Sequence, residues 1–306
     1  MQHLSNQLRG TLLVALSGTL FGFLGYLGTQ LIDMNLSIEN MLFWRFLMAS
    51  ICLLPGILLF KSQQSLKNMP KSVLIKTLIV SAICYTGNSA FYFIAAEHIG
   101  TGLAMVIFFS FPVFVTILMW LFDGWRANKY AVAALVAVGF GMILLKGHGV
   151  DAVNLHGVFF AVLAAVCYAF YIYDNQHHSK SIDARLLTLL VCMGNTVIFL
   201  IWSLTTQTFT IPNTLEMWFF IFLIGIIATT LPIQLLLNGL KYISPVKASI
   251  ISVLEPVVTL VLGCLLLAET VAPLQLLGVV IILLGAIFIQ FESQPDTKTS
   301  SSKAEN

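Results

Sequence analysis

Apolar stretches of about twenty residues recur along the whole chain and are separated by short polar segments. A helix needs about 20 predominantly apolar residues to cross the hydrocarbon core of a bilayer. The pattern therefore predicts ten membrane-spanning helices, at residues 11–32, 39–60, 73–95, 101–122, 130–145, 157–175, 186–205, 215–240, 248–268 and 272–291. The predicted fold class is an all-α integral membrane protein.

The composition supports this prediction and excludes several classes of function. Of the 306 residues, 58% are hydrophobic and only 9% are charged, whereas soluble domains carry about 25% charged residues. A net charge of +2 without a basic patch predicts no nucleic-acid partner. The five cysteines lie scattered in apolar stretches, so we expect no disulfide, metal or cofactor site. No phosphate-binding loop or hydrolytic motif occurs, which argues against an ATP-driven pump and against an enzyme.

The positive charges are distributed unevenly between the two sides of the predicted membrane. Twelve of the 15 Lys and Arg residues fall in loops on one side, and only Lys146 falls on the other. The remaining two, Arg45 and Lys76, lie inside predicted spans. Because cytoplasmic loops are enriched in Lys and Arg, the asymmetry predicts an even number of spans with both termini in the cytoplasm.

The two halves of the chain resemble each other in sequence. Matching residues at a shift of 144 are Thr86/Thr230, Ile99/Ile243, Ala104/Ala248, Ile107/Ile251, Pro112–Val113/Pro256–Val257 and Gly141/Gly285, and those at a shift of 147 are Gly10/Gly157, Leu16/Leu163, Phe23/Phe170 and Tyr26/Tyr173. We interpret residues 1–146 and 157–291 as two five-helix repeats, 147–156 as the loop between them, and 292–306 as a disordered cytoplasmic tail.

Since each half has an odd number of spans, the repeats are predicted to be inverted relative to each other. Inverted repeats allow a site at their interface to open first to one side of the membrane and then to the other. The symmetry therefore favours a transporter.

Over essentially its whole length, the chain resembles the EamA-type members of the drug/metabolite transporter superfamily. The resemblance is carried by Ala248 to Ser252, by Leu254-Glu255-Pro256-Val257, by Leu266-Leu267-Ala268-Glu269 and by Leu277-Gly278 and Gly285. The first half keeps Pro112-Val113 and Gly141 but has Trp125 where the repeat would place the acidic residue. The resemblance implies the inverted-repeat fold, solute transport and a cytoplasmic-membrane location, with an organelle membrane as the alternative. It does not identify a substrate.

Glu255 is the strongest candidate for a functional residue. An ionised carboxylate inside a bilayer is costly, so it should face a cavity or a partner, or be protonated. Pro256 is expected to kink the helix beside it, and Ser252 and Thr259 share its face. Glu255 is predicted to couple protons or to bind a substrate amine. The alternative is a structural acid that bonds to a neighbouring helix.

Arg45 is the second candidate charge, near the outer end of the second span. It could pair with a substrate carboxylate or with an acid in a cavity. It could equally have a structural role or extend its long side chain to the interface.

Polar side chains also form stripes on three predicted helices. The third span carries Tyr85, Asn88 and Tyr92, the sixth carries Tyr168, Tyr171 and Asn175, and the eighth carries Thr230, Gln234 and Asn238. Such stripes turn inward in a membrane, either to line a wet cavity or to bond neighbouring helices. Together they predict a polar, aromatic-walled cavity for a small zwitterionic or ring-bearing solute.

These observations lead to one functional hypothesis and two alternatives. The hypothesis is a secondary transporter that exports or exchanges a small metabolite such as an amino acid, with protons as one candidate for coupling. The alternatives are an uncoupled facilitator or channel, and a membrane assembly protein that moves no solute. The expected partners are the lipid bilayer and the small-molecule substrate, in a monomer or a homodimer.

Overall fold

The computed structural model of the chain describes residues 2–59, 71–145, 154–179, 182–266 and 272–291. The predicted tail 292–306, most of the loop 147–156 and Glu269 lie outside the described residues. Eight helices in the described part are long and apolar enough to cross a membrane, and two shorter apolar helices, Lys129–Leu144 and Pro273–Phe288, accompany them. The all-helical fold with about ten membrane helices is therefore confirmed.

Helices in the first half follow the five predicted spans. They are α1 (Gln2–Phe21) with α2 (Phe23–Asp33), α3 (Ile38–Leu59), α5 (Lys71–Ile99), α6 (Thr101–Phe108) with α7 (Phe111–Asp123), and α8 (Lys129–Leu145). The first and fourth spans each consist of two consecutive helices, where the apolar pattern alone predicts one.

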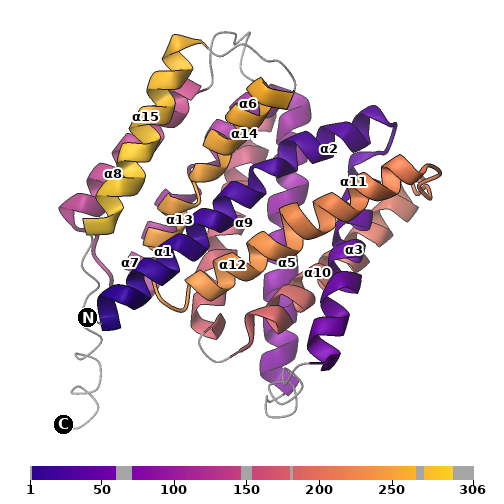
Figure 1. Cartoon of the computed structure of the whole chain (residues 1–306), viewed down its shortest axis with the longest axis horizontal. Helices are drawn as coiled ribbons and strands as arrows, with labels where there is room; N and C mark the ends of the chain where they lie inside the picture. The colour runs from indigo at the N-terminus through magenta and orange to yellow at the C-terminus, as the bar shows by residue number, and fades with distance from the viewer. Residues whose placement is uncertain (1, 60–70, 146–153, 180–181, 267–271, 292–306) are drawn as a thin grey trace.

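The second half repeats this order. It comprises α9 (Leu155–Ser179), α10 (Ala184–Thr205), α11 (Leu215–Gly225) with the π-helix η1 (Ile226–Thr230) and α12 (Leu231–Gly239), α13 (Pro245–Ile251) with α14 (Leu254–Leu266), and α15 (Pro273–Phe288) with the 3₁₀ turn η2 (Ile289–Phe291). We call the end of the bundle where α1 begins the N-terminal face, and the end where α2 and α5 finish the distal face (Figure 1).

The packing of the helices follows the inverted repeat. Helix α1 packs on α12, and the equivalent helices α9 and α5 pack on each other in the same way. Helix α3 packs on its own counterpart α10, and α8 packs on its counterpart α15. The last pair lies side by side at one edge of the bundle in Figure 1. Each pair joins one half of the chain to the other, so neither half forms a separate globular unit.

Glycines at the contacts between the two halves make equivalent contacts in each repeat. A Cβ added to Gly10 would lie 2.8 Å from the Cβ of Tyr242, and one added to Gly157 would lie 2.9 Å from the Cβ of His98. Gly157 is 147 residues after Gly10, and Tyr242 is 144 residues after His98. The two contacts are thus the same contact made twice, once in each direction.

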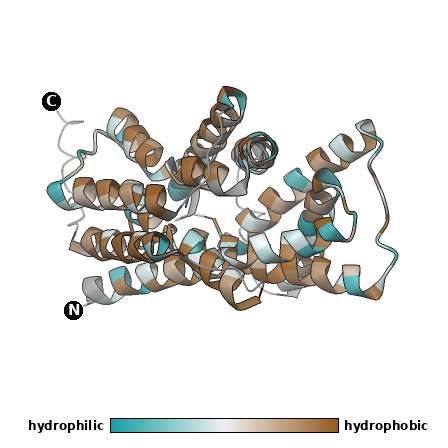
Figure 2. Cartoon of the chain, turned by 90° about the horizontal axis from the view of Figure 1, so that it is seen from above, coloured by the Kyte–Doolittle hydropathy of each residue, from teal (hydrophilic) through white to brown (hydrophobic). Residues whose placement is uncertain are grey.

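The outer surface of the bundle is apolar, as a lipid-facing surface should be. More than half of the surface of side chains such as Leu12, Val136, Phe159 and Val197 is exposed. Figure 2 shows hydrophobic residues along most of the helices and hydrophilic residues mainly near their ends. The described helices therefore do not show the polar outer face that is typical of soluble proteins, because both the core and the surface of the bundle are apolar.

Both repeats have a break in the middle of their fourth span. Helix α6 ends at Phe108 and α7 begins at Phe111, while α13 ends at Ile251 and α14 begins at Leu254. Pro112 and Pro256 stand in the first turn of the following helix, where a missing backbone donor is tolerated. The shared Pro-Val pair therefore marks two discontinuous helices at matching depth, which is how many transporters build a central site.

Gly141→Ala should destabilise the fold, because α8 and α15 approach closely at this glycine. The added Cβ would lie 2.8 Å from the backbone oxygen of Gly278, which cannot move aside as a side chain can. We expect a loss of about 1–3 kcal/mol, typical of overpacking, measured as unfolding free energy in mixed micelles. Gly139→Ala on the same helix is the control, because nothing lies within 4 Å of its added Cβ. Equal stability of the two variants would contradict this packing.

Candidate functional site

A cavity of about 560 Å³ opens towards the distal face of the bundle. Its wall is built from the distal parts of α2, α5, α6 and α14, and it reaches Thr29 and Glu97 near the ends of α2 and α5. Gln275 in the first turn of α15 also belongs to this outer part. The volume suits a small metabolite and lies within the usual range of ligand sites.

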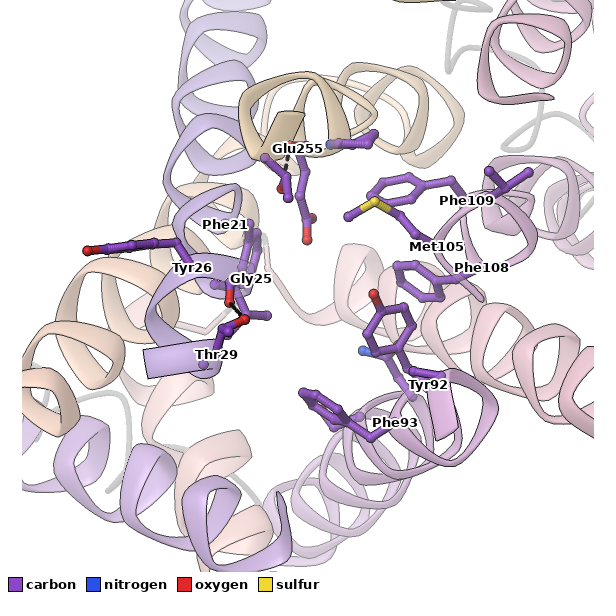
Figure 3. A pocket seen from close by; sticks show the side chains of 18 of the residues that line it. Phe21, Gly25, Tyr26, Thr29, Tyr92, Phe93, Met105, Phe108, Phe109 and Glu255 are labelled. Atoms are coloured by element: carbon purple, nitrogen blue, oxygen red, sulfur yellow. Dashed lines mark hydrogen bonds between the residues drawn. The ribbon is translucent and has the colours of Figure 1, made fainter. Parts of the chain in front are cut away.

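Glu255 stands at the inner end of this cavity. It lies in the first turn of α14, immediately after the break that follows α13. Figure 3 shows its carboxylate pointing into the open space, towards the side that carries Tyr92, Met105 and Phe108. The N-terminus of a helix favours a negative charge, so the broken helix provides a suitable position for an acid within the membrane.

Arg45 approaches the same cavity from α3. Only 2% of this residue is exposed, so the sequence-based alternative in which it extends to the interface is wrong. Its Nε donates a hydrogen bond of 2.6 Å to Thr229 Oγ1, and Nη2 donates one of 3.3 Å to the carbonyl of Ala228. The guanidinium also lies near the Tyr85 hydroxyl and interacts electrostatically with Glu255.

The acceptors of Arg45 are available because of Pro232. In a regular α-helix the N–H of residue 232 would bond to the carbonyl of Ala228, but proline has no N–H and its ring would collide with that carbonyl. The chain widens into η1, and the hydroxyls of Thr229 and Thr230 donate to carbonyls five residues earlier, each at 2.8 Å. The released carbonyl of Ala228 is then satisfied by Arg45, which locks α3 to this irregular segment.

Aromatic rings close the inner end of the cavity. Tyr85 lies with its ring centroid 4.9 Å from that of Tyr171 and 6.3 Å from that of Tyr168. Phe108 and Phe111 pack on Tyr168 at 5.6 and 4.8 Å. This cluster of five rings separates the cavity from the N-terminal face of the bundle.

Most of the residues predicted for the site are brought together. Seven of the predicted residues line the cavity, namely Arg45, Tyr85, Asn88, Tyr92, Tyr168, Glu255 and Thr259. Their roles in binding stay a prediction. The stripe on α5 is the most informative, because Tyr85, Asn88 and Tyr92 all face the same space.

Six residues of the predicted site and stripes do not line the cavity in this conformation, namely Tyr171, Asn175, Thr230, Gln234, Asn238 and Ser252. Ser252 is buried and donates to the carbonyl of Ala248. Gln234 and Asn238 lie further along α12 towards the N-terminal face, where Asn238 Oδ1 accepts a 3.1 Å hydrogen bond from Lys241 Nζ. Burial lowers the pKa of the Lys241 ammonium, and Asp183 opposes this effect. The stripe on α12 therefore bonds within its own helix and to the next loop.

The sequence interpretation missed several cavity residues. Phe93, Met105, Phe108 and Phe109 form a large part of the wall. Apolar residues are so common in this chain that their spacing carries no signal for a cavity. Glu97 also lines the cavity, but spacing does not identify it, because a residue five positions after Tyr92 lies on a different face of α5.

The site thus combines two opposite charges with an aromatic wall. Glu255 can accept hydrogen bonds from an ammonium group or carry a proton, and Arg45 supplies positive charge nearby. In a cavity of low dielectric such charges discriminate strongly between solutes of different charge. No covalent chemistry is needed for this arrangement to bind a small solute.

Comparisons with known proteins agree with this architecture. The EamA-like transporter family matches the chain twice, over residues 8–146 and 155–291. A solved crystal structure covers 91% of this chain and 95% of its own, with a TM-score of 0.79 at 15% sequence identity. At that identity the likeness shows the fold alone.

Relatives with curated descriptions are transporters. The uncharacterized transporter YcbK of Bacillus subtilis is 24% identical over 246 residues, which are 77% of this chain and 76% of the relative. The threonine/homoserine exporter RhtA of Escherichia coli is 25% identical over 213 residues, 69% of this chain and 68% of the relative. The double family match, the inverted fold and the central cavity lead to one conclusion: this chain belongs to the EamA-like transporter family, in the drug/metabolite transporter superfamily, and is a multi-pass membrane transporter.

Proposed function

We propose that the chain is a secondary transporter that exports or exchanges a small zwitterionic metabolite, such as an amino acid, by alternating access. Glu255 binds the substrate amine or carries the coupling proton, and Arg45 attracts the substrate carboxylate. Thr259, Asn88 and the tyrosines of α5 and α9 complete the site.

The observation that carries this proposal is the pairing of opposite charges in one cavity. Arg45 and Glu255 come from opposite halves of the chain and both line the same space. They interact electrostatically without being joined by a direct salt bridge, which leaves room for a solute between them. A zwitterion can satisfy both charges at once, whereas a neutral sugar or a purely apolar drug cannot.

The proposed direction of transport depends on the orientation of the chain. The distribution of Lys and Arg favours a cytoplasmic N-terminal face. The cavity would then be open to the outside in this conformation. The name of the relative RhtA, a threonine/homoserine exporter, supports export of a small amino acid. Both termini would lie in the cytoplasm of a cell with this protein in its cytoplasmic membrane.

Solute flux in proteoliposomes tests this proposal. The vesicles contain pooled labelled amino acids in one set, nucleosides in a second and sugars in a third, and efflux is compared with and without a pH gradient. We expect amino-acid efflux that depends on the protein and responds to the gradient. Protein-dependent efflux that ignores the gradient would instead support an uncoupled facilitator. Efflux of sugars in preference to amino acids would contradict the charge-pair argument.

A further inference from the structure

The cavity lies on the distal side of the bundle and ends inside it at the cluster of aromatic rings around Tyr168. Beyond the proposed function, on which this inference rests, we propose that the path across the bundle continues as a closed half between α7 and α9, and that Asp123, Tyr173 and His177 form the latch that holds it shut. Each repeat contains residues equivalent to those that line the open cavity in the other.

The reciprocal glycine contacts establish that equivalence. Gly141 faces Gly278 and Ile282, and Gly285 faces Ala134 and Val138. Adding 144 to Ala134, Val138 and Gly141 gives Gly278, Ile282 and Gly285. The shift of 144 therefore relates both sequence and contacts for these helices, and the shift of 147 does so for α1–α2 and α9, as Gly10 and Gly157 show. Residues of the open cavity can thus be matched to counterparts in the other repeat.

The counterparts of the open cavity are buried. Met105 and Val106 of α6 line the cavity and are partly exposed, whereas their counterparts in α13, Ser249 and Ile250, are 0% exposed. Gly28 of α2 corresponds to Asn175 of α9, which is also fully buried. Asn175 donates to Ser81 Oγ at 3.1 Å, so its polar side chain ties α9 to α5 on the closed side.

Tyr171 supports the same assignment independently. It is the counterpart of Leu24, which lines the open cavity. The Tyr171 hydroxyl is buried, and within the described residues it has no hydrogen-bond partner. A buried hydroxyl without a partner is unfavourable, and it would be satisfied if water or solute entered this part of the bundle.

The ends of α7 and α9 are joined directly at the N-terminal face. The Tyr173 hydroxyl donates a 3.0 Å hydrogen bond to Asp123 Oδ1, and His177 Nε2 lies 3.7 Å from the same oxygen. The ring of Phe122 packs on that of Tyr173 at 5.8 Å. Tyr173 corresponds to Tyr26, which stands at the open cavity on the other side. These contacts join α7 to α9, which must separate for the closed half to form a cavity.

Site-resolved cysteine labelling in nanodiscs tests the assignment, because both faces are accessible there. Met105→Cys and Ser249→Cys are matched repeat positions, and a membrane-impermeant maleimide is the probe. Mass spectrometry identifies the labelled residue, so the five native cysteines can remain. We expect Met105→Cys to label much faster than Ser249→Cys in an otherwise wild-type chain.

Asp123→Asn is then added to each reporter. Because the latch is partly exposed, we expect a modest effect, with the labelling rate of Ser249→Cys rising roughly two- to fivefold and that of Met105→Cys not rising. Tyr173→Phe, which removes the donor, should act in the same direction. Glu216→Gln, an exposed acid at the beginning of α11, is the control and should change neither rate.

Several outcomes would overturn the inference. If Ser249→Cys labels as fast as Met105→Cys in the chain that keeps Asp123, the half between α7 and α9 is not closed. If Asp123→Asn raises both rates, the protein has loosened generally, and if it raises neither, the three residues are not a latch. Solute flux without the expected labelling pattern would overturn the proposed latch but not the proposed function. The expected labelling pattern without flux of any solute would overturn the proposed function and support the latch.

Discussion

Glu255→Gln is expected to lower amino-acid efflux from proteoliposomes roughly 30- to 1,000-fold, the cost of removing one member of a desolvated charge pair. The substitution keeps the shape of the side chain and removes its ability to carry a negative charge. Because the carboxylate points into the cavity (Figure 3), the loss falls on the substrate or the proton and not on helix packing. Initial efflux rates at equal amounts of reconstituted protein measure the effect.

Glu97→Gln is the matched control for this variant. Glu97 lines the same cavity but is exposed near its distal opening, where water screens its charge. We expect its efflux to stay within about threefold of wild type. Wild-type efflux in Glu255→Gln would assign Glu255 a structural role. Loss of the response to the pH gradient with normal solute exchange would identify it as the coupling acid alone.

Replacement of Arg45 by leucine should affect both stability and transport. The buried carbonyl of Ala228 would lose its donor, and Pro232 prevents the helix from supplying another. Thr229 would lose a hydrogen-bond donor as well. We expect a loss of about 2–5 kcal/mol in unfolding free energy, as for other broken buried networks. Unfolding in mixed micelles and efflux from proteoliposomes measure the two effects separately.

A double variant distinguishes the structural role of Arg45 from its role in transport. Pro232→Ala in the Arg45→Leu background restores a backbone N–H opposite the carbonyl of Ala228. We expect this variant to regain part of the lost stability but no efflux. If efflux returns together with stability, Arg45 only positions η1 and does not act on the solute. Arg45→Lys keeps the charge without the planar guanidinium, and should retain more efflux than Arg45→Leu.

The residues of the two repeats also explain why the cavity is asymmetric. Ser252 and Glu255 in the second half correspond to Phe108 and Phe111 in the first. The first repeat therefore contributes aromatic packing at the position where the second contributes an acid. A single carboxylate at the centre lowers the cost of exposing the site to either side of the membrane, because only one acid must be hydrated or neutralised.

The sequence alone was sufficient to predict the helical membrane fold, the inverted repeats and the position of Glu255 at a cavity, whereas the role of Glu255 stays a prediction. These features follow from local quantities, such as the length of apolar stretches, a repeated Pro-Val pair and the rarity of charges in lipid. The stripe of Tyr85, Asn88 and Tyr92 was also predictable, since residues three and four apart share one face of a helix.

Tertiary structure decided which faces meet. Spacing places Gln234 and Asn238 on one face of α12, as it places Tyr85 and Asn88 on one face of α5, but only the second face turns to the cavity. The bond from Arg45 to Thr229 joins residues 184 positions apart. Pro232 disrupts the helix locally, but only the fold places α3 and Arg45 against the widened segment η1. Such features depend on the rotation of each helix about its axis, which is set by packing against helices far away in the sequence and not by local pattern.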